Sequence, residues 1–169
     1  MRGQCIPYDT DAINQLLGIP LILEEGQQCE YTSWRGRAIG FDEEAISQLL
    51  FFPSCDFVCS MTGKRLRIMH TNMATLTQIW MTFLLSNILP SDHNSDLILP
   101  KCQLMYSFME HISVHVAQLI SDALHQFVII EPPRHPMNPD KSNKALGFLA
   151  LITCLYQFYG VSVTPAKHI

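Results

Sequence analysis

Residues 71–90 read TNMATLTQIWMTFLLSNILP, and this stretch contains no Asp, Glu, Lys or Arg. Its polar side chains recur at spacings of 4, 3, 4 and 4 residues, which places them along one side of an α-helix. They are Thr71, Thr75, Gln78, Thr82 and Ser86. We therefore predict a helix over about 71–87, ended by Pro90. Because an uncharged polar stripe is unusual on a solvent-facing side, the stripe is a candidate face for another helix or for a partner protein.

Helical patterns dominate the chain after residue 70. Pro100 suits the first turn of one helix, another is expected through Val116 and Ile120, and Gly160 closes the last, over about 143–159. Residues 131–140, EPPRHPMNPD, contain four prolines and indicate a surface loop. The uncharged stretches 68–91 and 145–166 carry too many polar residues or helix breakers to span lipid, so we expect buried core helices and no membrane partner.

The N-terminal part of the chain contains a repeat. Residues 2–20 (RGQCIPYDTDAINQLLGIP) and residues 35–53 (RGRAIGFDEEAISQLLFFP) are identical at ten of nineteen positions. In each copy an Asp, Asp9 or Asp42, occupies the N-cap position of a short amphipathic helix.

These patterns predict a mainly α fold. We expect a compact multi-helix domain whose short extended segments lie in the duplicated N-terminal unit, residues 1–53. Residues 68–163 form the helical body, and residues 1–169 form a single domain.

The composition excludes several classes of protein. With 169 residues, 48% hydrophobic and 15% charged, the chain has enough apolar content for a core and does not resemble a disordered segment. A net charge of −4 argues against a dedicated nucleic-acid-binding module, which is typically basic. The six cysteines are expected to be reduced thiols of an intracellular protein, in the cytoplasm or the nucleus, because the N-terminal residues contain no apolar signal core.

Two clusters of side chains are candidates for chemistry. Lys64, Arg65 and Arg67 form the only basic cluster and could contact nucleic-acid phosphates, although phosphate loops usually add glycines and a helix start. A second group would share one face of an unbroken helix and could hold zinc, but a solvent-exposed face is the simpler interpretation, and a break at Ser113 would separate its first member. This group is His111, His115, Gln118, Asp122 and His125. Cys55 and Cys59, without a second pair, are a weak metal signal.

No catalytic motif is present in the sequence. It lacks a G-x-S-x-G elbow, a phosphate-binding P-loop and a G-x-G-x-x-G fingerprint. The acidic residues are accounted for as helix caps, first-turn residues and turn residues. We therefore expect no enzyme activity, no cofactor and no metal.

Four segments, taken in order, resemble the putative plant transposon protein domain found in retrotransposon-derived reading frames of plants. They are Arg2-Gly3 with AINQLLGIP (Ala12 to Pro20), IWMTFLLSNILP (Ile79 to Pro90) followed by His93, LMYSFMEHISVHVAQLISDAL (Leu104 to Leu124) and LGFLALITCLYQFYGV (Leu146 to Val161). The resemblance covers nearly the whole chain. It implies a plant nuclear genome as the source and a mobile-element origin, with no established activity and no catalytic motif to carry over.

The leading hypothesis is a non-catalytic helical interaction or structural domain of a plant retrotransposon-derived protein. Such a domain would be capsid-like or accessory to a larger polyprotein, and its partner would be another protein or a second copy. The alternative is a nucleic-acid-associated accessory module that uses Lys64, Arg65 and Arg67. A metal-dependent enzyme that uses the histidine group is the third hypothesis.

Overall fold

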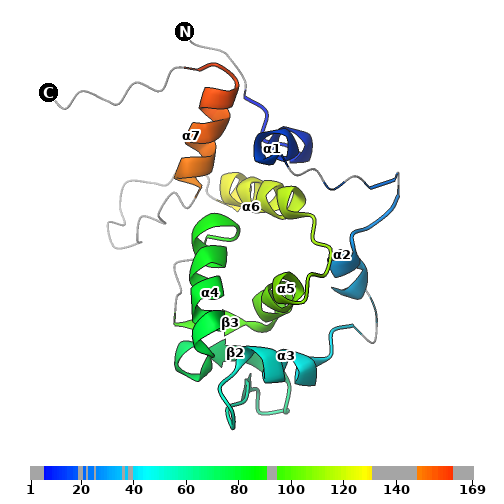
Figure 1. The fold of residues 1–169 in the computed structure, drawn as a ribbon, viewed down its shortest axis with the longest axis vertical. Helices are drawn as coiled ribbons and strands as arrows, with labels where there is room; N and C mark the ends of the chain where they lie inside the picture. Colours follow the sequence, from blue (N-terminus) through cyan, green and yellow to red (C-terminus); the bar gives the residue numbers. More distant parts are fainter. Residues whose placement is uncertain are drawn as a thin grey trace, which may run out of the picture. The chain divides into compact units, whose positions relative to one another are not determined.

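The computed structural model describes residues 6–18, 21, 23, 24, 26–35, 37, 40–90, 95–130 and 148–161 (Figure 1). The chain divides into two compact units, one made of residues 1–21 and 116–169 and the other of residues 22–115. A single domain over residues 1–169 therefore stays a prediction. Within the described ranges, no helix combines the length and the apolar character that crossing a membrane requires.

Residues 22–115 contain a three-stranded antiparallel sheet, so the prediction of a mainly α fold is wrong. The strands β1 (Val58–Cys59), β2 (Arg65–Met69) and β3 (Asp96–Ile98) lie in that order. The fold is helix-rich but mixed α/β, and the described residues of the duplicated N-terminal unit, 1–53, form no strand. Strands this short show too little alternation to be recognised in a sequence.

The sheet is held by one buried cross-strand pair. Ile68 of β2 lies opposite Leu97 of β3, and both side chains are fully buried. Both strands contact helix α5 (Leu99–Met109). Side chains paired across two strands point to the same face, so this face of the sheet is the one that packs on α5.

Helix α5 is the centre of this unit. It contacts the sheet, α3 (Glu43–Leu50) and α4 (Thr75–Asn87). Cys102, Leu104 and Met105 are all fully or almost fully buried. Because these three positions point in different directions around a helix, α5 is enclosed on several sides. Pro100 lies in its first turn, as predicted.

Helix α4 begins four residues later than predicted. The 3-10 helix η1 (His70–Asn72) precedes it, and the backbone N–H of Ala74 donates to the carbonyl of Leu50 over 3.0 Å. This bond joins the start of α4 to the end of α3. The predicted helix is therefore confirmed from residue 75 onward.

An aromatic cluster joins α2 (Glu30–Arg35) to the core helix α5. The ring of Phe41 lies 5.9 Å from that of Tyr31, 5.4 Å from that of Trp34 and 6.2 Å from that of Tyr106, measured between centroids. The preceding residue must be glycine, because a Cβ atom on Gly40 would lie 2.7 Å from the carbonyl oxygen of Trp34. Close approach of the backbone to Trp34 thus positions Phe41 in the cluster.

The other unit is helical in its described residues. Helix α1 (Thr10–Leu17) contacts both α6 (Val116–Ile130) and α7 (Leu149–Phe158). The Thr10 hydroxyl donates to the Gln118 side-chain oxygen over 2.8 Å, and Ile13, Ile120 and Leu155 are buried. Gly160 ends α7 with a positive φ of 71°, as predicted. The predicted loop 131–140 and the first residues of the last predicted helix, 143–147, lie outside the described residues.

The two copies of the repeat form helices of the same extent. Helices α1 and α3 each contain eight residues and begin directly after Asp9 and Asp42. The Asp9 carboxylate accepts from the N–H of Ala12 and the Asp42 carboxylate from that of Glu44, both over 2.9 Å. The predicted N-caps are confirmed, but the two helices belong to different compact units.

Thr77 provides a test of the core packing around α4. Its side chain is fully buried, and its hydroxyl has no hydrogen-bond partner. A buried hydroxyl without a partner keeps its desolvation penalty. We expect Thr77→Val to raise the free energy of unfolding by about 1 kcal/mol, measured by chemical denaturation.

The matched control is Ser107→Ala in α5. The Ser107 hydroxyl is equally buried but donates to the carbonyl of Gln103 over 2.8 Å. This variant should not be stabilised. A loss of stability in Thr77→Val would contradict the prediction.

Candidate interaction surface

The side of α4 that points away from the core is exposed and uncharged. Its apolar side chains are Leu76, 56% exposed, Ile79, 62% exposed, and Phe83, 48% exposed. Thr75, Thr82 and Ser86 are also exposed. We refer to these six residues together as the α4 outer face. The opposite side of the helix, with Thr77, Met81, Leu84 and Leu85, is buried.

The predicted polar stripe is only one edge of this face. Thr71 lies in η1, outside the helix, and Gln78 is half-buried. The Gln78 side-chain nitrogen donates to the carbonyls of Met73 and His70, over 3.0 and 3.3 Å. These bonds join the first turns of α4 to the segment that precedes it. Thr75, Thr82 and Ser86 remain as the polar edge of the α4 outer face.

The apolar part of the face was missed in the sequence because α4 has apolar residues on two sides. Leu76, Ile79 and Phe83 follow one another at spacings of 3 and 4, as apolar residues of an interacting helix do. Met81, Leu84 and Leu85 form a second apolar side. A separate test of each side of the helix would have found the outer row.

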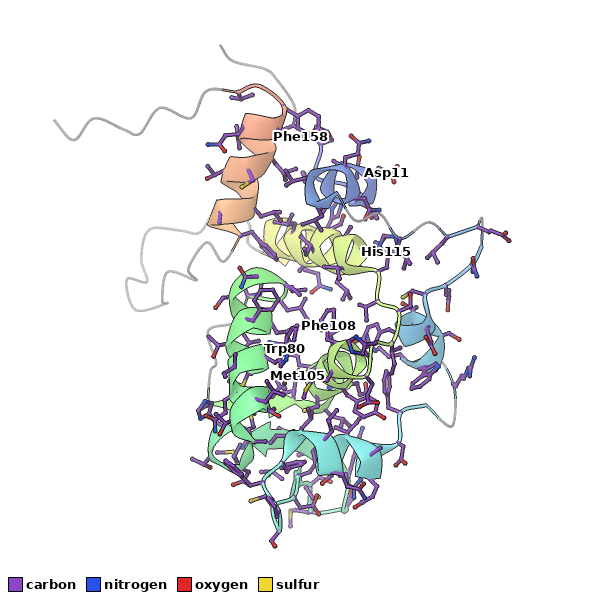
Figure 2. All side chains as sticks on the ribbon, viewed as in Figure 1. Asp11, Trp80, Met105, Phe108, His115 and Phe158 are labelled. Carbon is purple, nitrogen blue, oxygen red and sulfur yellow. The ribbon has the colours of Figure 1, made fainter. Side chains whose placement is uncertain are left out.

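Local contacts hold the α4 outer face in one arrangement. The Phe83 ring meets the edge of Trp80 with centroids 5.8 Å apart and planes at 89°. In Figure 2, Trp80 lies on the side of α4 nearer to α5. The Thr82 hydroxyl donates to the carbonyl of Gln78 over 3.0 Å, and the Asn87 amide to that of Phe83 over 2.9 Å. The exposed side chains therefore belong to a helix whose surface is ordered by ring contacts and side-chain hydrogen bonds.

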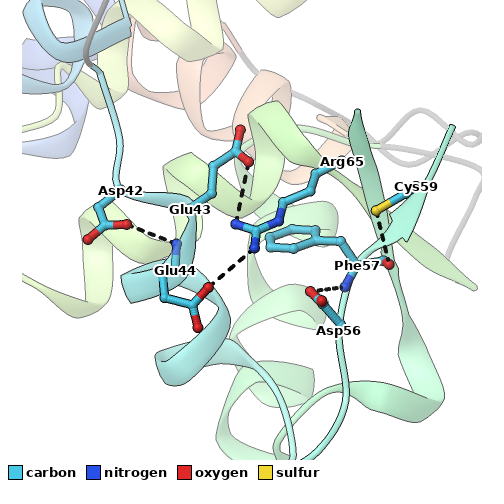
Figure 3. Close-up of polar contacts among 7 residues, drawn as sticks. All are labelled: Asp42, Glu43, Glu44, Asp56, Phe57, Cys59 and Arg65. Atoms are coloured by element: carbon cyan, nitrogen blue, oxygen red, sulfur yellow. Dashed lines mark hydrogen bonds and ion pairs between the residues drawn. The ribbon is translucent and has the colours of Figure 1, made fainter. Parts of the chain in front are cut away.

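The basic cluster lies on the β1–β2 hairpin and β2, where carboxylates surround it (Figure 3). The Arg65 guanidinium pairs with Glu44 over 3.2 Å and with Glu43 over 3.5 Å, and it lies 5.3 Å from the ring centroid of Phe57. Removal from solvent disfavours the charged form of Arg65. The hydrogen bond to Glu44 and the nearby charges of Asp56, Glu43 and Glu44 outweigh it, so the pKa of Arg65 is raised.

Arg67, also on β2, is paired with a residue of the neighbouring strand β3. Its guanidinium bonds the carboxylate of Asp96 over 2.7 Å. Burial lowers the pKa of Lys101, and the charge of Asp96 acts in the opposite direction. Lys64 is exposed at the hairpin turn. Three cations thus share this surface with four carboxylates, Glu43, Glu44, Asp56 and Asp96, so it does not form a basic patch.

The predicted histidine group does not lie on one helix. Helix α5 ends at Met109, and His111 follows in a turn with a positive φ of 56°. The N–H of Ile112 donates to the carbonyl of Ser107 over 2.8 Å, which is the bond of a Schellman helix end. Helix α6 begins only at Val116, so His111 and His115 precede it and Gln118, Asp122 and His125 lie on it.

The α6 members of this group contact their own unit. The Gln118 amide donates to the Asp122 carboxylate over 2.7 Å, and the ring of His125 lies 5.1 Å from that of Tyr8. Among the described residues, no group of three or more His, Cys, Asp or Glu side chains could hold a metal ion.

The described cysteines are free thiols in different environments. Cys29 and Cys102 are buried, Cys55 is half-buried, and Cys59 and Cys154 are exposed. Burial raises the pKa of the Cys102 thiol, whose sulfur donates to the carbonyl of Leu97 over 3.3 Å. Cys102 is therefore a packed, unreactive side chain of the core.

Comparison with known proteins finds one family. A family model described as a putative plant retrotransposon-related domain matches residues 1–162. No curated protein and no solved structure matches the chain. The match agrees with the resemblance found in the sequence.

The two arginines of β2 should differ in their contribution to stability. Arg65→Met removes two ion pairs and the contact with Phe57, so we expect the free energy of unfolding to fall by about 1 kcal/mol. Arg67→Met removes one pair of a more exposed side chain and should cost less than about 0.5 kcal/mol. Chemical denaturation of both variants measures this. Stability unchanged in Arg65→Met would show that its ion pairs contribute nothing.

Thiol labelling should separate the cysteines by burial. In the native protein near neutral pH, iodoacetamide is expected to alkylate Cys59 and Cys154 before the other cysteines that the structure describes. Cys102 should react more than about 100-fold more slowly, since its reaction requires opening of the core. Peptide mass spectrometry over a time course measures each rate. Equal rates for Cys102 and Cys59 would contradict the buried position of Cys102.

Proposed function

The chain belongs to the family of putative plant retrotransposon-related domains, and on this basis we propose that it is a non-catalytic interaction or structural domain of a retrotransposon-derived protein. Its interaction surface is the α4 outer face. The proposed role is to bind another protein chain inside the cell, in the cytoplasm or the nucleus, as part of a larger assembly.

One observation carries this proposal: Leu76, Ile79 and Phe83 are about half exposed and adjacent on a single helix. Isolated apolar residues are common on protein surfaces, but a contiguous row is not. Covering such a row with a partner is favourable by roughly 25 cal/mol for each Å² removed from water. The helix beneath is supported on its other side by α5, so binding would require little ordering.

The nucleic-acid alternative receives less support from the β1–β2 hairpin. A phosphate would compete with Glu43, Glu44 and Asp96 for the two arginines, and only Lys64 is without a carboxylate in these ion pairs. The surrounding carboxylates would also repel a polyanion. The metal-enzyme alternative required one continuous helix face, which the turn at His111 interrupts.

The proposal is tested by recovering bound proteins with three forms of the chain: the wild type, Ile79→Glu and Ile98→Glu. Ile98 is a matched control, because it is 49% exposed on β3. It lies opposite Arg67 on β2, so the positive charge of Arg67 would face the introduced carboxylate. Each form is immobilised and exposed to plant extract supplemented with the same chain carrying a different tag.

We expect the wild type and Ile98→Glu to retain specific protein partners. The added chain with the different tag counts as one of these partners. Ile79→Glu should retain at least about tenfold less, since a charge in the centre of an apolar contact must be desolvated. Retention of the same proteins in the same amounts by all three forms would remove the α4 outer face as the interaction surface. Retention of none would overturn the proposed function itself.

A further inference from the structure

We propose that the occupant of the α4 outer face is a second copy of this chain, bound in an antiparallel, two-fold symmetric pair of α4 helices. This inference rests on the proposed function and names its partner. It is argued from the spacing, the charge and the helix ends of α4.

The outer row of α4 is symmetric about the middle of the helix. Leu76, Ile79, Phe83 and Ser86 follow at spacings of 3, 4 and 3, and this row and the helix Thr75–Asn87 are both centred on residue 81. A two-fold axis through that point would place Ile79 against Phe83 of the second copy and Leu76 against Ser86 of the second copy. Both helices would then overlap along their full length, and each contact would occur twice, as in every two-fold symmetric interface.

The charge distribution fits a second copy better than a different partner. Residues 68–91 contain no Asp, Glu, Lys or Arg, although the chain as a whole carries a net charge of −4. Two like-charged molecules can approach through this face without setting like charges against each other. A different partner recognised by complementary charge would find no charged group to pair with on this helix.

The ends of α4 also favour an antiparallel neighbour. No side chain caps the helix N-terminus at Ala74, no acidic residue lies in its first turn, and no basic residue lies in its last. The helix dipole is therefore uncompensated by charged side chains at either end. An antiparallel copy brings a carbonyl end beside each N–H end, so each dipole is offset by the other.

The size of the contact predicts a weak dimer. The row spans the eleven residues from Leu76 to Ser86, whose ten steps of 1.5 Å give a length of about 15 Å. Three apolar side chains from each copy cover less than the roughly 1,200 Å² of a stable interface. We therefore expect a dissociation constant on the order of 100 µM, which repeated copies in an assembly would strengthen.

The experiment is sedimentation equilibrium of the full chain up to about 1 mM, a range set by the expected affinity. Two double variants are compared with the wild type: Ile79→Glu/Phe83→Glu and Ile79→Lys/Phe83→Lys. Each places like charges in the centre of the proposed pair, so each alone should associate at least tenfold more weakly than the wild type. An equimolar mixture of the two should recover association, because opposite charges then meet across the two-fold axis.

Circular dichroism confirms that each variant is folded. If either charged variant is not, Ile79→Gln/Phe83→Gln takes its place in the measurement of weakened association, and the mixture is made only from two folded charged variants. Ile98→Glu is the control for the added charge and should dimerise as the wild type does. A wild type that stays monomeric, double variants that still associate, or a mixture that does not recover would each overturn the inference. A monomeric wild type that nevertheless retains other proteins through Ile79 would leave the proposed function intact.

Discussion

The enclosure of α5 is the constraint on which the structure of residues 22–115 depends. Cys102, Leu104 and Met105 point in different directions around this helix and are all buried, so it must be surrounded. The sheet covers one side through Ile68 and Leu97, while α3 and α4 cover others. Three short strands would not be stable by themselves, and the apolar surface of α5 is what makes their pairing favourable. The α4 outer face exists because only one side of α4 is used for this enclosure.

Local signals in the sequence were sufficient for several helices. Asp9, Asp42 and Pro100 were placed correctly because capping and first-turn preferences depend on a few neighbouring residues. The sheet was not predicted, because β2 has a single fully buried residue, Ile68, and β3 has only three residues. Its stability comes from contact with α5, and tertiary contacts of this kind leave no periodic signal in a short strand.

The candidate surface was predicted in part for a related reason. The polar stripe was recognised from its regular spacing, and its exposed members Thr75, Thr82 and Ser86 do lie on the outer side of α4. Ile79 and Phe83 beside them were not assigned to this side, because α4 has a second apolar side that packs in the core and one search over the whole helix does not distinguish the two. The role of the basic cluster could not be judged from the sequence either. Glu43 and Glu44 lie 22 and 21 residues before Arg65, and only the fold brings them together.

The two copies of the N-terminal repeat pack in different environments. The same aspartate-capped helix serves one core as α1 and another as α3, and the equivalent side chains Leu17 and Leu50 are 39% exposed and fully buried. In genetic terms, recombination between the copies in their 33-residue register would delete α2 and merge the two helices into one. One compact unit would then lack a helix that the other retained. The two copies are therefore similar in sequence but not interchangeable in the fold, since each supplies a helix to a different compact unit.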